Sequence, residues 1–354
     1  MSTVNGIAAA LAEAHVLVVT GAGGVGKTTT AAALGLDAAR AGRRTLVVTI
    51  DPARRLAQAL GLEGLGDTPE RIALDGAGAD AGELWAMMLD MQTTFDRLVA
   101  RHAVDADAAA RITSNRIYRT LSSTLAGTQE YMAMERLHEL HEDGEWDLIV
   151  VDTPPTRSAL DFLDAPRRMT SFLEGRLLRL LLAPGLAAGR GIGRLVGVGT
   201  GAFLRVAGRV TGMELLDDLA EFFRGFEGMY EGFKRRAEQV LHLLSDPSSR
   251  FVVVASPEPP PLAEARFLLE RLEQEGLTTA GVVINRLRPP IEGAPDEAAL
   301  AAAVGRLDGG DAEDRAAARA LALVGDVRRI AERQRRDVAA ALHGLAGRTL
   351  VEVP

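Results

Sequence analysis

Short runs of apolar and β-branched residues alternate with longer helical stretches along the chain of 354 residues. Near-continuous apolar runs are typical of parallel strands that helices cover on both faces. The alternation predicts an α/β fold with a doubly wound, mostly parallel sheet, whose ligand binds at the carboxyl ends of the strands. Near the end of the chain, the acidic, Ala-rich stretch 292–318 predicts one helix flanked by a loop. The expected strands are residues 16–20, 45–50, 84–89, 148–152, 251–256, 281–284 and 350–353.

A different pattern interrupts this alternation between residues 166 and 245. Residues 166–212 carry eight arginines against a single acid, Glu174, with Leu-rich and Gly-rich runs between them. Apolar residues at helical spacing then predict an amphipathic helix over 215–244. We therefore expect a helical insertion at 166–245, which leaves residues 1–165 and 246–354 for the sheet domain. Its Arg and Leu side chains suit an apolar client or a membrane surface, and equally a face packed against neighbouring helices.

The strongest chemical signal is GAGGVGKT at residues 21–28, which matches the phosphate-binding pattern G-x-x-x-x-G-K-T. It lies between an expected strand and an Ala-rich helical run, as a P-loop must. Glycines let the backbone wrap around an anion, and the helix start adds its positive dipole end. Lys27 would reach the β- and γ-phosphates, and the Thr28 hydroxyl would bind Mg²⁺. The sequence therefore predicts a P-loop NTPase fold that binds ATP or ADP with Mg²⁺. The expected nucleotide contacts are Gly21, Ala22, Gly23, Gly24, Val25, Gly26, Lys27, Thr28 and Thr29.

Three further polar residues follow expected strands of the same sheet: Asp51, Asp152 and Asn285. An Asp at the end of a buried strand beside a P-loop can hold a Mg²⁺-bound water, which suits Asp152. Asp51 could orient the water that attacks the γ-phosphate. Asn285 offers a donor and an acceptor that match adenine. Taken singly, the two acids could also be helix N-caps and Asn285 a turn residue.

The segments GAGGVGKTT, TIDPARRL, DTPPTRSALDFL and VINRL together resemble the arsenical pump-driving and tail-anchored-protein-targeting ATPases. That family belongs to the deviant-Walker class of P-loop ATPases, and the resemblance covers nearly the whole chain. It implies a nucleotide-gated dimer in which closure of the two subunits shapes a helical surface for a hydrophobic client. The catalytic residues it implies are Asp51 and Lys27, the Mg²⁺ ligands are Thr28, Asp51 and Asp152, and the base contacts are Asn285 and Pro257.

The sequence departs from this family at Ala22, where the P-loop usually carries a second, signature lysine that reaches into the partner's site. A missing cation in trans can cost about 10³-fold or more in rate. Either Arg54, Arg55 or Arg157 replaces it, or a lysine-bearing paralogue pairs with this chain, as actinobacterial-type members of the family suggest. In the second case the chain would be a catalytically weak regulatory subunit of a heterodimer rather than half of a homodimer.

Composition narrows the partners further. The chain has no cysteine, so neither a metalloid thiolate site nor a zinc site through Cys can form, and arsenite transport is not expected. The net charge of −8 does not favour nucleic acid as a partner. The sequence shows neither a signal-peptide pattern nor an apolar run of about twenty residues, so we expect a cytoplasmic protein, with peripheral membrane contact as an option. A Min/Par-type positioning ATPase is the third alternative, and the large helical insertion argues against it.

Overall fold

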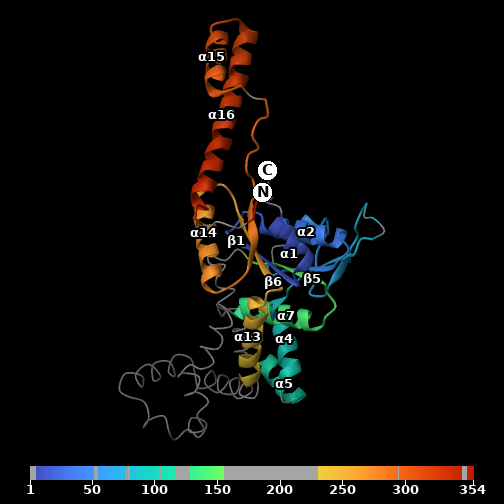
Figure 1. The fold of residues 1–354 in the computed structure, drawn as a ribbon. Coiled ribbons are helices and arrows are strands. Elements are labelled where there is room, and N and C mark those ends of the chain that lie inside the picture. Colours follow the sequence, from blue (N-terminus) through green and yellow to red (C-terminus); the bar gives the residue numbers. More distant parts are fainter. Residues whose placement is uncertain are drawn as a thin grey trace, which may run out of the picture.

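The structure is a computed structural model that describes residues 5–51, 55–76, 78, 80–103, 105–115, 128–154, 230–293, 295–344 and 349–354. Its centre is an eight-stranded sheet with the strand order β3-β4-β2-β5-β1-β6-β7-β8 (Figure 1). Every neighbouring pair is parallel except β3 and β4. The strands are β1 (Val16–Gly21), β2 (Arg44–Thr49), β3 (Glu70–Ile72), β4 (Glu83–Met88), β5 (Leu148–Asp152), β6 (Ser249–Ala255), β7 (Thr279–Ile284) and β8 (Leu350–Glu352).

The mostly parallel α/β sheet confirms the fold class expected from the sequence, and all seven expected strands are present. The strand that the sequence did not predict is β3, a three-residue edge strand antiparallel to β4. Glu70 and Arg71 are exposed, so this strand has no apolar run to reveal it. It forms because the backbone of β4 offers it a free edge, which is a long-range effect.

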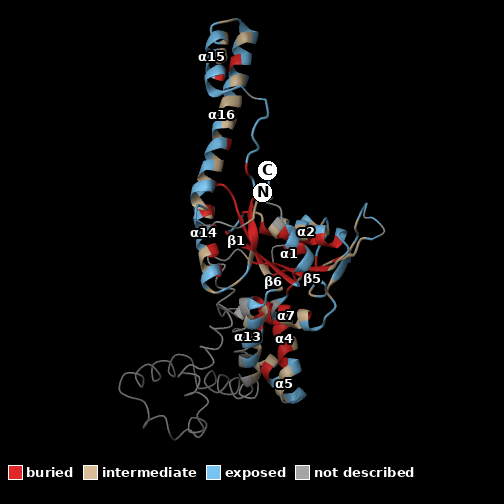
Figure 2. Cartoon of the chain, viewed as in Figure 1, coloured by how far each residue is buried: buried red, intermediate tan, exposed pale blue. Residues whose placement is uncertain are grey.

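Alternate residues of each central strand enter two different cores, one on each face of the sheet. Figure 2 shows buried residues along the central strands of the sheet. In β1, Val16 and Val18 belong to one core, and Leu17 and Val19 belong to the other. The first core also takes residues from helices α7 (Thr128–Glu142), α13 (Tyr230–Ser245) and α14 (Pro259–Gln274); the second takes them from α1 (Asn5–Glu13), α2 (Lys27–Arg40) and α3 (Arg55–Ala59). Since burying one such side chain contributes about 1.5–3 kcal/mol, this double coverage explains the near-continuous apolar strands.

A separate helical group joins α7 and α13 to α4 (Met91–His102) and α5 (Ala106–Ser114) (Figure 1). Ion pairs cross this group, with Arg236 of α13 on Glu135 of α7 and Arg101 of α4 on Glu139 of α7. Helix α13 overlaps the second half of the amphipathic helix that the sequence predicts over 215–244 and ends one residue beyond it. Residues 155–229, which hold most of the expected insertion, lie outside the described residues, so the insertion stays a prediction.

The region after β7 differs from the sequence prediction, because it contains two helices where one was expected. Helices α15 (Glu297–Leu307) and α16 (Ala312–Ala341) form a hairpin that projects from the sheet domain (Figure 1). At 1.5 Å per residue, the 30 residues of α16 span about 45 Å. Asp311 caps α16 and forms a capping box with Asp314, which sets the start of the helix after the Gly-Gly turn. Among the described residues, no helix is both long enough and apolar enough to cross a membrane.

Candidate nucleotide-binding site

The loop between β1 and α2 has the backbone of a phosphate-binding loop. Gly21, Gly24 and Gly26 have φ angles of 148°, 78° and 98°, which side-chain-bearing residues rarely adopt. Gly26 is the N-cap of α2 and has no side chain to cover the first N–H groups of the helix. The loop therefore leaves backbone donors and the positive end of the helix dipole available to an anion.

Two of these glycines are also required by close contacts with neighbouring strands. A Cβ atom at Gly21 would overlap the carbonyl oxygen of Val254 in β6. A Cβ atom at Gly26 would overlap the side-chain amide of Asn285, which follows β7. The loop is thus clamped by the two strands that come next in the sheet order after β1, and its shape depends on the absence of side chains at both points.

Lys27 is buried within this loop, and its ammonium group is held by the loop itself. Its Nζ donates hydrogen bonds of 2.9 Å to the carbonyl oxygens of Gly21 and Ala22. Burial lowers the pKa of Lys27, and the negative charges of Asp152, Glu264 and Asp51, in that order, act against the lowering. The lysine predicted to contact phosphate therefore lies near three carboxylates.

The ends of β2 and β5 bring the two predicted acids together through one threonine. The register of the strands pairs Thr49 with Asp152. The Thr49 hydroxyl donates to Asp152 Oδ2 at 2.8 Å and accepts from the backbone N–H of Asp51 at 3.2 Å. Asp51 is buried, and its Oδ2 accepts from the Arg55 guanidinium at 3.0 Å. Of the three arginines named as substitutes for the signature lysine, Arg55 thus contacts Asp51, whereas Arg54 and Arg157 lie outside the described residues.

Asp152 is the most deeply buried of these acids, with no exposed surface. Burial raises its pKa to about 6, although the Thr49 and Thr28 hydroxyls and the charge of Lys27 act in the opposite direction. Its second oxygen, Oδ1, has no hydrogen-bond partner among the described residues. A buried carboxylate oxygen left unpaired is costly, and a hard cation such as Mg²⁺ would satisfy it. Asp152 and the nearby Thr28 hydroxyl therefore fit a Mg²⁺ site.

Asn285 and Pro257 lie at the ends of the strands beside β1. The side-chain amide of Asn285 donates to the carbonyl oxygen of Val25 at 2.9 Å, and its oxygen accepts from the N–H of Arg286 at 3.0 Å. Asn285 thus braces the phosphate loop, a role that the sequence analysis missed because no local pattern signals it. Pro257 is buried after β6. The contact of these two residues with adenine stays a prediction.

Glu264 of α14 is a second residue that the sequence analysis missed. Its Oε1 is buried and has no hydrogen-bond partner among the described residues. Burial raises the pKa of Glu264, and Lys27 acts against the rise. The sequence offered one signal for this residue, which is an acid placed between apolar residues of the same helix, Leu262 and Ala265, both buried. Ala22, by contrast, is buried against the second core, so its methyl group offers the loop no charge.

Comparison with known proteins shows similarity to one family of ATPases over most of the sheet domain. A model of the family described as anion-transporting ATPase matches residues 14–293, which include β1 to β7 and end before the hairpin. An uncharacterized protein of Streptomyces coelicolor is 32% identical over 280 residues, 77% of this chain and 62% of that protein. A protein of Aquifex aeolicus with the provisional name arsenical pump-driving ATPase 1 is 24% identical over 287 residues, 78% of this chain and 64% of that protein. ATPase get3 of Aspergillus terreus is 26% identical over 275 residues, 77% and 73% of the two chains. The chain therefore spans 62% and 64% of the length of the first two relatives.

Proposed function

The chain belongs to the family of anion-transporting ATPases, and from this premise we propose that it binds and hydrolyses ATP at the loop between β1 and α2. The observation that carries the proposal is the arrangement around Lys27. A buried ammonium lies in a glycine loop at the start of a helix, and Asp152 presents an unsatisfied oxygen beside it. That combination suits a phosphate chain with its Mg²⁺.

The residues divide the work of this reaction. Lys27 exchanges the carbonyl oxygens of Gly21 and Ala22 for phosphate oxygens, to which it makes stronger, charge-assisted hydrogen bonds. Asp152 and Thr28 would hold Mg²⁺, which would neutralise charge on the phosphates when bound. Asp51 orients the attacking water, and Arg55 and Thr49 fix its position. The second role expected of Asp51, as a Mg²⁺ ligand, belongs to the same proposal.

We further propose that the ATPase works as a dimer whose nucleotide state controls a surface for a hydrophobic client. The two named relatives are ATPases, one of them named for an arsenical pump. The absence of cysteine argues against an arsenite site in this chain. The expected client surface lies mostly in residues 155–229, outside the described residues, and rests on the sequence pattern.

A second candidate function is that of a regulatory subunit that binds ATP and turns it over slowly. The observation that favours this function is Ala22. It is buried and uncharged, and it occupies the position of the lysine that in the family reaches into the partner's site. Comparing phosphate release by this chain alone with release by a mixture with a lysine-bearing paralogue separates the two functions. A homodimer that turns over as fast as the mixture would exclude the regulatory role.

Calorimetric titration of Mg·ATP into Lys27→Ala tests the proposed site. Loss of charge-assisted phosphate contacts in a buried site should weaken binding by about 2–3 kcal/mol, or roughly 30- to 150-fold. Lys234→Ala is the matched control, because residue 234 is the only other lysine in the chain. Unchanged affinity in Lys27→Ala would refute the assignment of this loop as the nucleotide site.

A further inference from the structure

The projecting helix α16 carries an exposed apolar stripe with the spacing of a coiled-coil seam. Its residues alternate at intervals of four and three, the spacing that keeps one face of a helix toward a partner helix. Leu323, at the centre, is 63% exposed, which is the largest exposure among the large apolar side chains of the described residues. The seam residues are Ala316, Ala320, Leu323, Val327 and Ile330, of which the first three are exposed and the last two half-buried.

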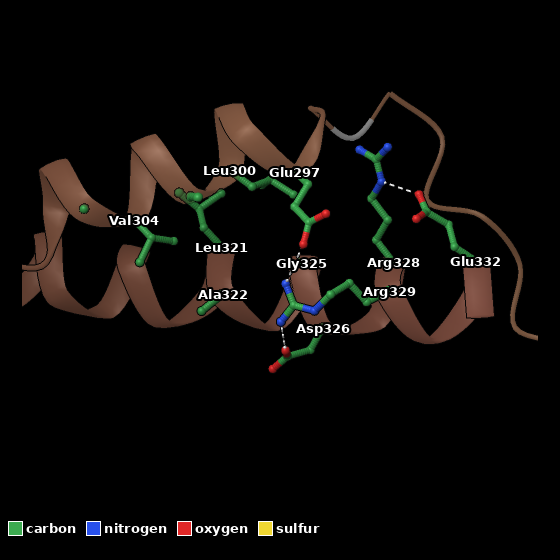
Figure 3. A pocket seen from close by; sticks show the side chains of 12 residues that line it. Glu297, Leu300, Val304, Leu321, Ala322, Gly325, Asp326, Arg328, Arg329 and Glu332 are labelled. Carbon is green, nitrogen blue, oxygen red and sulfur yellow. Dashed lines mark hydrogen bonds and ion pairs between the residues drawn. The ribbon is translucent and has the colours of Figure 1, made fainter. Parts of the chain in front are cut away.

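The seam lies on a different face of α16 from the contact with α15. The groove between the two helices, about 390 Å³ in volume, is lined on the α16 side by residues such as Leu321, Gly325 and Arg328 (Figure 3). Arg329 crosses to Glu297 of α15 at 3.5 Å and closes this side of the hairpin. Within the part of the chain that the structure describes, the hairpin is therefore held together without its seam, and Ala316, Ala320 and Leu323 stay exposed.

We propose that the seam binds the same seam of a second copy of this chain, with the two α16 helices antiparallel. In an antiparallel pair, the residue numbers of any two facing residues add up to the same value, and this value defines the register. A value of 643 places Leu323 opposite Ala320 of the second copy. The same register places Val327 opposite Ala316, so that Leu323 and Val327 each meet an alanine on both sides of the two-fold axis, while Ile330 lies opposite Glu313 at the end of the seam.

The charges beside the seam favour this register. Arg319 and Asp326 occupy the flanking position on the same edge of the seam, and both are exposed. Asp326 pairs with Arg329 of its own helix at 2.5 Å, so the proposed contact exchanges this exposed partner for Arg319 of the second copy. In the antiparallel pair, Arg319 of one copy faces Asp326 of the other, and symmetry repeats the pair. Sliding the helices by one heptad would place Asp326 against Asp326 and Arg319 against Arg333, which like charges oppose. A parallel pair would set Leu323 against Leu323 and would align none of these opposite charges.

The geometry of the hairpin leaves room for this association. The register brings residue 312, at the tip of one hairpin, beside residue 331 of the other. Ala331 is buried, and Gln334 and Arg335 just after it form hydrogen bonds with the backbone of Arg288, which follows β7. The paired length therefore ends close to the point where α16 meets the sheet domain. The family match ends at residue 293, so the contact is an addition to the shared ATPase core and is independent of its nucleotide site.

A charge-exchange experiment tests the proposal by sedimentation velocity, in EDTA and without nucleotide. The wild-type mass should rise with concentration. Arg319→Glu alone and Asp326→Arg alone should lose this rise, because each homodimer then faces like charges. An equimolar mixture of the two variants should restore it, because both pairs become attractive. A mixture no heavier than its components, or wild-type association unchanged by either variant, would overturn the proposal. ATP binding should be equal in all of these proteins, which separates this test from that of the nucleotide site.

Cysteine cross-linking tests the orientation, because the chain has no native cysteine. A mixture of Leu323→Cys and Ala320→Cys should form more cross-linked dimer than either variant alone. Arg306→Cys, exposed on α15, is the matched control and should not cross-link. Preferential cross-linking of Leu323→Cys with itself would indicate a parallel pair and would contradict the proposed register.

Discussion

Replacing the buried Asp152 by Asn should change how the stability of the ligand-free protein depends on pH. Asp152 has no exposed surface, and burial raises its pKa from 3.8 to about 6. The folded protein therefore holds this proton more tightly than the unfolded chain does. The stabilisation from this group is complete below about pH 4 and is lost as the pH rises through about 6. The side-chain amide that replaces the carboxyl group in the variant has no such proton to gain or lose.

The two pKa values set the size of the effect. A difference of about 2 pKa units corresponds to about 3 kcal/mol across the whole transition. Between about pH 7.5 and about pH 5, the wild-type protein should gain about 1.4 kcal/mol from this group, and Asp152→Asn should gain none of it. The charged form that costs stability at neutral pH is the form that a metal ion needs, so Mg·ADP should stabilise the wild-type protein more than the variant.

Urea unfolding in EDTA at several pH values measures this difference directly. The difference in free energy of unfolding between the wild-type protein and Asp152→Asn should change by about 1.4 kcal/mol over this range, since titrations common to both proteins cancel. Asp308→Asn, an exposed acid at the end of α15, should run parallel to the wild-type protein. Parallel curves for Asp152→Asn as well would show that Asp152 titrates alike in both states, and the reasoning from burial would be wrong.

Two further predictions concern hydrolysis. Asp51→Asn should leave Mg·ATP affinity nearly unchanged and lower the rate of phosphate release, because its proposed role is to orient water during the reaction; turnover equal to the parent, measured with any required partner present, would assign that role to another residue. Ala22→Lys should raise turnover of the chain alone by up to about 10³-fold if a cation in trans is what it lacks. Fast turnover that this change does not alter would indicate that another cation is already in place, with Arg55 the first to test by substitution.

The sequence predicted the features that local patterns encode. All five residues of β5 are buried, so the strand is visible in the sequence as an apolar run. The glycine loop at residues 21–28 is likewise recognisable from its sequence pattern. The edge strand β3 was missed because its first two residues, Glu70 and Arg71, are exposed. The extent of α16 was missed because its sequence is rich in Ala and charged residues and carries only a narrow apolar seam, so that the capping at Asp311 and the packing on α15 define the helix.

Contacts between distant residues account for what the sequence left out of the site. The hydrogen bond from Thr49 to Asp152 joins residues 103 positions apart, and that from Asn285 to Val25 joins residues 260 positions apart. Glu264 reaches the neighbourhood of Lys27 only because α14 packs beside β1. The order and register of the strands bring these residues together, and neither can be predicted from a local pattern of residues.

The hold of the loop on its own lysine has a consequence for discrimination between nucleotides. Any molecule that draws the ammonium of Lys27 outward must replace two good hydrogen bonds, those to Gly21 and Ala22. A ligand with charged oxygens at that point would recover this loss, whereas a nucleoside, which carries no phosphate, would not. If the loop binds nucleotides as proposed, its own carbonyl oxygens compete with the ligand for this lysine, and we expect di- and triphosphates to bind more tightly than monophosphates.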